Sequence, residues 1–357
     1  MTTESESSLL PQVERFVRQI IEDASKQRLP ELFSGDYPNA VYRVPDRNGV
    51  GVIALRTSDL TEEQLIKIMR YRMAQYLAVN FVDTGLVYEG QIEHEPLENL
   101  SPDDIHIIAG SVESGEILCY AVLEGGIESP PGATFRSRDR PLFPVEKVHG
   151  WGIYNRLYIL PDIPVTKLRE MGRFVKNQQL HTLSELGGRA PVEVGIAIFR
   201  MLSGPLRLEV EAVIGDLEEG VAMRNLEFFN VPMVVLHGTV PYLSEASYFF
   251  PRYQYCNVYP FATLAADISK TMLSRLDAIE QALAAPGKKG LMALFSLKRN
   301  IERPRSSLEP ARGLAPLSEA DMPQREIPMR QRRQLLDVGQ TLGSTSLFAG
   351  LSTAEAT

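Results

Sequence analysis

Apolar positions recur with a helical period in two long segments of this chain and alternate with polar positions in the segment between them. Residues 8–28 place their apolar side chains on one helical face, namely Val13, Phe16, Val17, Ile20 and Ile21. Residues 60–82 predict a second long helix, with Thr61 as its cap. Between these helices, residues 39–55 predict two short strands around a loop.

The middle of the chain predicts strands that alternate with helices. Residues 104–124 read as a β-hairpin, because two apolar strand-like runs flank the short turn Glu113-Ser114-Gly115. The patterns that follow predict, in order, strand 168–176, helix 191–203 opened by Pro191, strand 206–214, helix 216–229, strand 233–240, a strand candidate at 253–261 and helix 262–285. This order favours an α/β fold with a mixed sheet flanked by helices.

Composition narrows the class of protein. The chain has 357 residues, of which 44% are hydrophobic and 23% are charged, as in ordinary soluble globular proteins. Its formal net charge of -8 argues against nucleic acid as a main partner, because phosphate binding requires a basic surface. No C-x-x-C or H-E-x-x-H motif is present, so no metal site is expected. Cys119 and Cys256 lie in apolar strand-like runs, which favours buried thiols.

The two ends of the chain differ from its middle. The N-terminal residues lack the pattern of a signal peptide and no apolar run approaches about 18 residues, so a cytoplasmic protein is expected. We expect an N-terminal helical extension over residues 1–38, a central domain over 39–286 and a disordered tail over 287–357. Within the tail, basic residues flank an apolar segment: Lys288, Lys289, Lys298 and Arg299. One interpretation is that this segment lies at the surface of the anionic inner membrane or docks on an acidic partner. The other is a short tail helix that packs on the domain or stays solvated.

The stretch from Leu157 to Met201 holds the strongest candidate chemistry. Glu170 and Arg173 are three apart on a predicted strand and would point to opposite faces, so a direct pair requires a bulge or bend. Gly187 and Gly188 precede Pro191, and free N–H groups in such a glycine turn could bind phosphate or pantetheine oxygens. An ordinary glycine connection before a helix explains the same residues.

Four segments within residues 45–260 resemble a known family. They are MRYRMAQYLAVNFV with Arg72 and Tyr76, GEILCYAVL, REMGRFVKN with Glu170 and Arg173, and NLEFFNVPMVVLHG. Together with the order of elements, they resemble N-acyltransferases of the GNAT fold, in particular the acyl-homoserine-lactone synthases and the N-acyl amino acid synthases.

The chain departs from the family pattern at several positions. Gly172 stands where the family has Ser, and Val122 stands near the place of an Arg. The phosphate loop of acetyl-CoA-dependent members is missing. Five acids compete for the place of the family's paired aspartates: Glu93, Glu95, Glu98, Asp103 and Asp104.

The resemblance implies an activity and a set of site residues. It implies transfer of a fatty acyl group from acyl carrier protein, or from acyl-CoA, to the amine of an amino acid or related small molecule. No cofactor is expected to be tightly bound, since the donor is an acyl-phosphopantetheine. Catalysis would fall to Glu170 as general base and to Arg173. The donor would meet Phe174, Val175, Gly187, Gly188 and Arg189, and the acceptor Arg72, Tyr76, Trp151 and Asp104.

A carrier protein is acidic and would dock on basic residues, for which the candidates are Lys167, Arg169, Lys176 and Arg189. Two other functions fit the same sequence. One is a non-catalytic GNAT-like scaffold, and the other is an acetyl-CoA-dependent N-acetyltransferase. The depth of the cavity beside Glu170 separates fatty acyl transfer from acetyl transfer, because a fatty acyl chain needs a long apolar tunnel and an acetyl group needs a short closed pocket.

Overall fold

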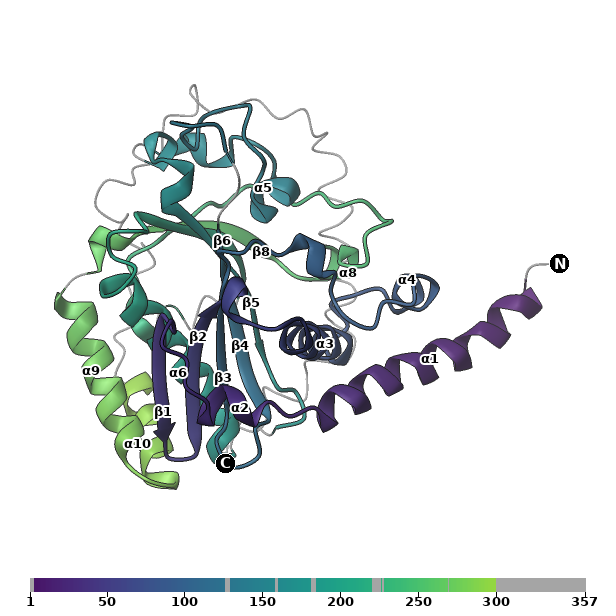
Figure 1. The fold of residues 1–357 in the computed structure, drawn as a ribbon. Coiled ribbons are helices and arrows are strands. Elements are labelled where there is room, and N and C mark those ends of the chain that lie inside the picture. Colours follow the sequence, from purple (N-terminus) through teal and green to yellow (C-terminus); the bar gives the residue numbers. More distant parts are fainter. Residues whose placement is uncertain are drawn as a thin grey trace.

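A computed structural model describes residues 3–125, 129–157, 160–180, 184–219, 226, 228–268 and 270–299. In these residues one eight-stranded sheet forms the centre of the fold (Figure 1), in the order β1-β2-β3-β4-β5-β6-β8-β7. The strands are β1 Tyr42–Arg47, β2 Val50–Arg56, β3 Ile105–Ser111, β4 Ile117–Glu124, β5 Leu168–Lys176, β6 Ala212–Glu218, β7 Val234–Val235 and β8 Val258–Leu264. All neighbours are antiparallel except β5 and β6, which are parallel. The prediction of a GNAT-like mixed sheet is confirmed.

Helices cover both faces of this sheet (Figure 1). They are α1 Thr3–Lys26, α2 Pro30–Ser34, α3 Glu62–Ala78, α4 Thr84–Glu89, α5 Pro144–His149, α6 Glu185–Ser203, α8 Phe250–Tyr255, α9 Lys270–Ala284 and α10 Lys288–Arg299. Strand β2 is buried on both sides, since Val52 and Ala54 join the core under α6 whereas Ile53 and Leu55 join the core under α3. The predicted helix at 60–82 is confirmed as α3, which begins with Thr61 in a capping box.

The segment between β4 and β5 forms a third, smaller core over β6 and β8. Phe135, Phe143 and Tyr154 are its large buried side chains. The Tyr154 hydroxyl donates to the carbonyl oxygens of Gly215 and Phe261, each at 3.1 Å, and so ties the segment to the sheet. This packing holds the short helix α5 above β5.

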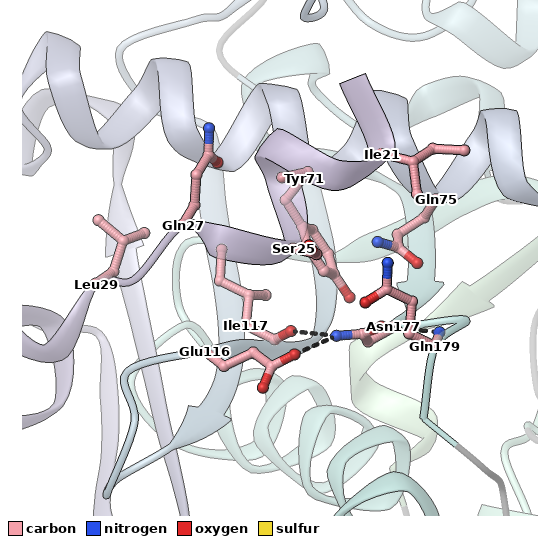
Figure 2. A pocket seen from close by; sticks show the side chains of 11 residues that line it. Ile21, Ser25, Gln27, Leu29, Tyr71, Gln75, Glu116, Ile117, Asn177 and Gln179 are labelled. Carbon is pink, nitrogen blue, oxygen red and sulfur yellow. Dashed lines mark hydrogen bonds between the residues drawn. The ribbon is translucent and has the colours of Figure 1, made fainter. Parts of the chain in front are cut away.

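The predicted N-terminal helix is confirmed as α1, whose first half extends from the body (Figure 1). Its second half packs on α3, where Ile20 and Ala24 are buried. Figure 2 shows the small pocket at this junction, where side chains of α1 and α3 meet the chain just after β5. There the Asn177 amide donates to the Glu116 carboxylate and the Ile117 carbonyl. These contacts fix the end of β5 farthest from Glu170.

The predicted glycine turn before Pro191 is wrong. Helix α6 begins at Glu185, and the Ser184 hydroxyl caps it by accepting from the Gly187 N–H at 3.1 Å. The Gly188 N–H donates to the Ser184 carbonyl, so both glycines belong to the first turns of the helix. Pro191 consequently lies inside α6 and does not begin it.

Several boundaries after residue 205 also differ from the prediction. Strand β6 begins at Ala212 and runs to Glu218, so Asp216 lies on a strand and does not cap a helix. Part of the predicted helix 216–229 falls on residues 220–225 and 227, outside the described residues. The alternating pattern of 206–211 belongs to a turn in which Leu208 is 84% exposed. Alternation in so short a run does not distinguish a strand from a turn.

The last predicted elements are shifted in the same way. The strand expected at 233–240 is reduced to β7, and the strand candidate at 253–261 contains α8 before β8 begins. The helix expected at 262–285 contains the end of β8 followed by α9.

The tail begins as a helix. Helix α10 packs on α9 and α6, so the short packed helix is the alternative that the structure contains. Residues 300–357, with most of the predicted disordered tail, lie outside the described residues.

Candidate active site

Strands β5 and β6 separate shortly after they pair. Three residue pairs join them in parallel, namely Leu168–Ala212, Arg169–Val213 and Glu170–Ile214. Beyond the last pair, β5 continues to Lys176 and β6 to Glu218, but the two strands no longer pair with each other. The residues that follow on both strands therefore line cavities.

Strand β5 carries a bulge at the point of separation. Gly172 lies opposite Val122 on β4, but Val175 lies opposite Tyr120, so β5 holds one extra residue here. Arg173 takes the left-handed conformation with φ of 55°. Because of the bulge, Glu170 and Arg173 line the same cavity although they are three residues apart. A direct pair between them is nevertheless not formed, since Arg173 faces Glu95 at 3.9 Å and Glu124 at 3.7 Å.

Two cavities meet at this bulge. The first, which we call the slot, has a volume of about 140 Å³ and is mainly apolar, with Tyr76, Phe81, Phe174, Val175, Phe199 and Phe229 in its walls. The second, the chamber, has a volume of about 340 Å³ and is lined by charged side chains, among them Arg72, Glu95, Glu124, Glu170 and Lys147. Both are lined by Gly172, Arg173, Asp216, Phe249 and Arg252.

Glu170 is the most deeply buried carboxylate of the chamber, with 5% of its surface exposed. The Val145 N–H of α5 donates to its carboxylate at 3.0 Å. Burial raises the pKa of Glu170 well above its usual value, and the charge of Glu124, its cross-strand neighbour, raises it further. The Val145 N–H and Arg173 act in the opposite direction. A carboxylate with so raised a pKa is suited to accept a proton near neutral pH.

A buried ion pair holds the turn that contacts Glu170. Arg140 and Glu146 lie 2.7 Å apart, and each side chain is 1% exposed. Glu146 also accepts from the Phe143 N–H, while Arg140 donates to the Phe135 carbonyl. Because the pair fixes the first turn of α5, it also fixes the Val145 N–H above Glu170.

Two further ion pairs lie in the chamber walls. Arg72 donates to Glu95 at 2.7 Å, with both side chains under 10% exposed. Asp216 accepts from Arg252 at 2.9 Å and from the Tyr253 hydroxyl at 2.8 Å. Burial acts to raise the pKa of Asp216, but Arg252, His149 and the Tyr253 hydroxyl together outweigh burial and lower that pKa below its usual value.

Some buried polar atoms beside the chamber lack a partner. Among the described residues, neither Glu95 Oε1 nor the Tyr76 hydroxyl has a hydrogen-bond partner. An unpaired buried acceptor costs about 1–3 kcal/mol, so such groups mark places where a bound molecule would bring hydrogen-bond donors.

The structure brings six of the predicted site residues to these cavities. Arg72, Glu170 and Arg173 line the chamber, and Arg173 with Tyr76, Phe174 and Val175 lines the slot.

Trp151 and Asp104 line neither cavity. Trp151 lies under the Arg138 guanidinium, 5.1 Å from the ring centroid. Asp104 accepts from the N–H groups of Ser101 and Gly125, and burial raises its pKa to about 6. It therefore holds a turn and does not face an acceptor.

Gly187, Gly188 and Arg189 also lie away from both cavities. Arg189 is fully buried, and its guanidinium donates to the carbonyl oxygens of Leu283, Ala285 and Gly287. These carbonyls end α9 and need donors, so Arg189 caps that helix. It is not available to bind a phosphate.

Of the four residues expected to form a basic docking patch for a carrier protein, Lys176 lies at the end of β5, and the other three are buried or paired. Arg189 is buried, and Arg169 is 5% exposed with its guanidinium on the carbonyls of Thr166 and Leu168. Lys167 is paired with Glu211 at 3.2 Å. These residues therefore do not present a continuous basic surface.

Five residues around the bulge were missed or left open by the sequence. Glu95 was one of five competing acids, and Glu124 follows the hairpin without a distinguishing motif. Asp216 was placed in a helix cap, Phe249 was one of several aromatic residues that either line an acyl tunnel or pack in the core, and Arg252 carried no signal. The acidic stretch after residue 82 and this aromatic cluster were the signals that pointed at Glu95 and Phe249.

In the described part of the chain, no group of three His, Cys, Asp or Glu side chains is placed to hold a metal ion. Cys119 is buried and Cys256 half-buried, and both thiols are free. Of the helices in the described residues, none is long and apolar enough to cross a membrane.

No protein family description matches this sequence, and no curated protein matches it either. Among solved structures it is similar to the CoA-dependent acyl-homoserine lactone synthase BjaI, solved with SAM and isopentyl-CoA. The identity is 13% and the TM-score 0.36, over 68% of this chain and 97% of that one. An acyl-CoA N-acyltransferase from Pseudomonas aeruginosa gives 14% and 0.32, over 60% of this chain and 99% of that one. Escherichia coli ElaA gives 11% and 0.31, with the same coverage. Similarity this remote does not identify an activity.

Proposed function

We propose that this chain is an N-acyltransferase that takes its acyl group from a CoA-type thioester. The observation that supports this is the junction of the slot and the chamber at the β5 bulge, where β5 and β6 separate. A thioester carbonyl at Arg173 would have an apolar cavity on one side for its acyl group. On the other side it would meet a charged cavity that can receive an amine.

Glu170 is the proposed proton acceptor. An ammonium group in the chamber would give a proton to its carboxylate, and the free amine nitrogen would then attack the thioester carbon. A C–N bond forms, the C–S bond breaks, and the thiolate takes the second proton of the amine. Glu170 releases the first proton to solvent. General-base help of this kind is worth roughly 10²–10⁴-fold in rate.

A small amine with a second polar group fits the chamber as acceptor. Glu95 Oε1 offers an open acceptor for an ammonium, and Arg173 could hold a carboxylate. An amino acid, the acceptor expected from the sequence, carries both groups. Amino acids are therefore the first acceptors to test.

Two acyl donors are to be compared, namely CoA thioesters and acyl carrier protein. Because Arg169 and Arg189 are buried, the residues expected to dock an acidic carrier do not favour it, and CoA thioesters are the first choice. Acyl carrier protein remains the second donor to test.

The decisive experiment incubates the full chain with acyl-CoA and amino acids, and measures thiol release together with amide product by mass spectrometry. Glu170→Gln is expected to lower kcat/KM by at least about 10²-fold. The matched control is Glu193→Gln, because Glu193 is also a buried glutamate but lies on α6 facing Arg47. The proposal fails if neither CoA nor carrier thioesters give an amide, or if the two variants are equally active.

A further inference from the structure

The slot is closed on one side by an aromatic ring that lies against the backbone of α6. Gly195 of α6 and Phe229 both line the slot. A Cβ atom added at Gly195 would lie 2.4 Å from two carbons of the Phe229 ring, much closer than carbon atoms approach. Glycine therefore permits a contact that no larger residue could make without moving the ring.

The Phe229 ring is held in place by its neighbours. Its centroid lies 5.4 Å from that of Phe199 on α6 and 5.2 Å from that of Phe228, the latter edge-on. Phe229 and Phe199 are both under 5% exposed. Rings packed in this way resist displacement, so the wall behind Gly195 is firm.

The volume of the slot limits what it can hold. It measures about 140 Å³, and a dry cavity of about 150 Å³ lined by Leu, Ile and Phe accommodates one benzene molecule. The volume of the slot is too small for a long fatty acyl chain and larger than an acetyl group occupies. The slot, which meets the Glu170 chamber at the β5 bulge, thus matches neither of the two extremes considered for the sequence.

We propose that the slot selects a compact acyl group of about six carbons, straight, branched or aromatic, and that the Gly195–Phe229 contact sets this limit. This inference rests on the proposed function, because it names the acyl group of that reaction.

Binding of CoA thioethers tests the size limit without any transfer step. S-Ethyl-, S-hexyl- and S-dodecyl-CoA have no acyl group to donate, and their affinities for the full chain are measured by calorimetry. S-Hexyl-CoA is expected to bind at least about tenfold tighter than S-ethyl-CoA, because each buried methylene contributes roughly fourfold. S-Dodecyl-CoA is expected to bind no tighter than S-hexyl-CoA.

Variants assign the limit to the contact. Phe229→Ala, and the milder Phe229→Leu, are expected to raise the affinity ratio of S-dodecyl- to S-hexyl-CoA, by about tenfold for Ala. Gly195→Ala is expected to weaken S-hexyl-CoA binding, because its methyl group must push the ring into the slot. Phe33→Ala is the matched control, since Phe33 is also a buried phenylalanine but lies on α2 and does not line the slot. Its ratio should equal that of the wild type, and each ratio is internal to one protein sample.

Three outcomes overturn the inference: S-dodecyl-CoA binds more tightly than S-hexyl-CoA to the wild type, Phe33→Ala and Phe229→Ala change the ratio equally, or no thioether binds. The proposed function fails separately, if thioethers bind with the expected preference but no amide is made from the corresponding thioesters.

Discussion

Two clusters of buried charge in this molecule can be compared directly. One lines the chamber around Glu170. The other joins β1, α6 and α9 through Arg47, Glu193, Arg200, Asp277 and Glu280. Each contains a glutamate whose pKa is raised chiefly by burial, strongly for Glu170 and to about 7 for Glu193. Each also contains a buried oxygen without a hydrogen-bond partner, Glu95 Oε1 in the chamber and Glu193 Oε1 in the other cluster.

What separates the clusters is space and arrangement. Glu170 borders a cavity of about 340 Å³ and has a second carboxylate, Glu124, as its neighbour across the strands. Glu193 lines neither the slot nor the chamber, and its other oxygen contacts Arg47 at 3.1 Å. A perturbed pKa alone would therefore nominate both residues. Because Glu193 also has a carboxylate, Glu280, in its cluster, it is the cavity that singles out Glu170.

The largest expected effect is the loss of the buried pair between Arg72 and Glu95. Glu95→Gln leaves the Arg72 guanidinium buried without its carboxylate, and breaking such a pair costs about 3–5 kcal/mol. Urea unfolding measures this loss. A loss below about 1 kcal/mol would mean that water reaches Arg72 and that the chamber is wetter than its packing implies.

The next effect concerns the pH dependence of stability at Glu193. Its folded pKa of about 7 exceeds the ordinary 4.5, so the folded state binds more protons than the unfolded state between these values. The free energy of unfolding therefore falls as pH rises through this window, by about 3 kcal/mol at most. Glu193→Gln should lack this fall, as measured by unfolding at pH 4.5 and pH 7.5. Equal pH dependence in the two proteins would contradict the assignment.

A subtler effect is expected on the pH profile of catalysis. Glu170 must be ionised to accept a proton, so kcat/KM should rise with pH through its raised pKa. Glu124→Gln removes the neighbouring negative charge, lowers the pKa of Glu170 and moves this acidic limb to lower pH. Glu193→Gln should leave the limb in place. An unmoved limb in Glu124→Gln would show that the two carboxylates do not interact.

The smallest effect is expected at the rim of the second cluster. Asp277 pairs with Arg200, but its side chain is 69% exposed. Asp277→Asn should change the free energy of unfolding by less than about 1 kcal/mol and leave activity unchanged. A larger loss would mean that the α6–α9 cluster acts as one cooperative unit.

The elements that could be predicted from the sequence are those whose signals are local. In helix α3 the helical spacing of apolar residues is sustained over a long segment that begins with a capping box at Thr61. The β3–β4 hairpin has a short turn that contains glycine. Glu170 and Arg173 were found because they share one motif on one strand. Their spacing showed that only a bulge or bend would bring them to one face, and the structure contains a bulge between them.

The parts that could not be predicted depend on residues distant in the sequence. Glu95, Asp216 and Arg252 reach the chamber from three separate segments, and only the separation of β5 from β6 brings them together. Arg189 looked like an anion-binding residue beside two glycines. Its role was decided by the carbonyls at the end of α9, almost a hundred residues later.

The bulge in β5 decides on which face of the sheet the Arg173 side chain lies. The extra residue in β5 leaves the pairing on either side of it with β4 intact, so the sheet accommodates the insertion without reorganising its core. A Cβ atom at Gly172 would have nothing nearer than the Glu124 carboxylate oxygen at 3.9 Å, so the inserted stretch is under little steric pressure. Without the extra residue, Glu170 and Arg173 would point to opposite faces of the sheet, so this one residue is what places a cation between the two cavities.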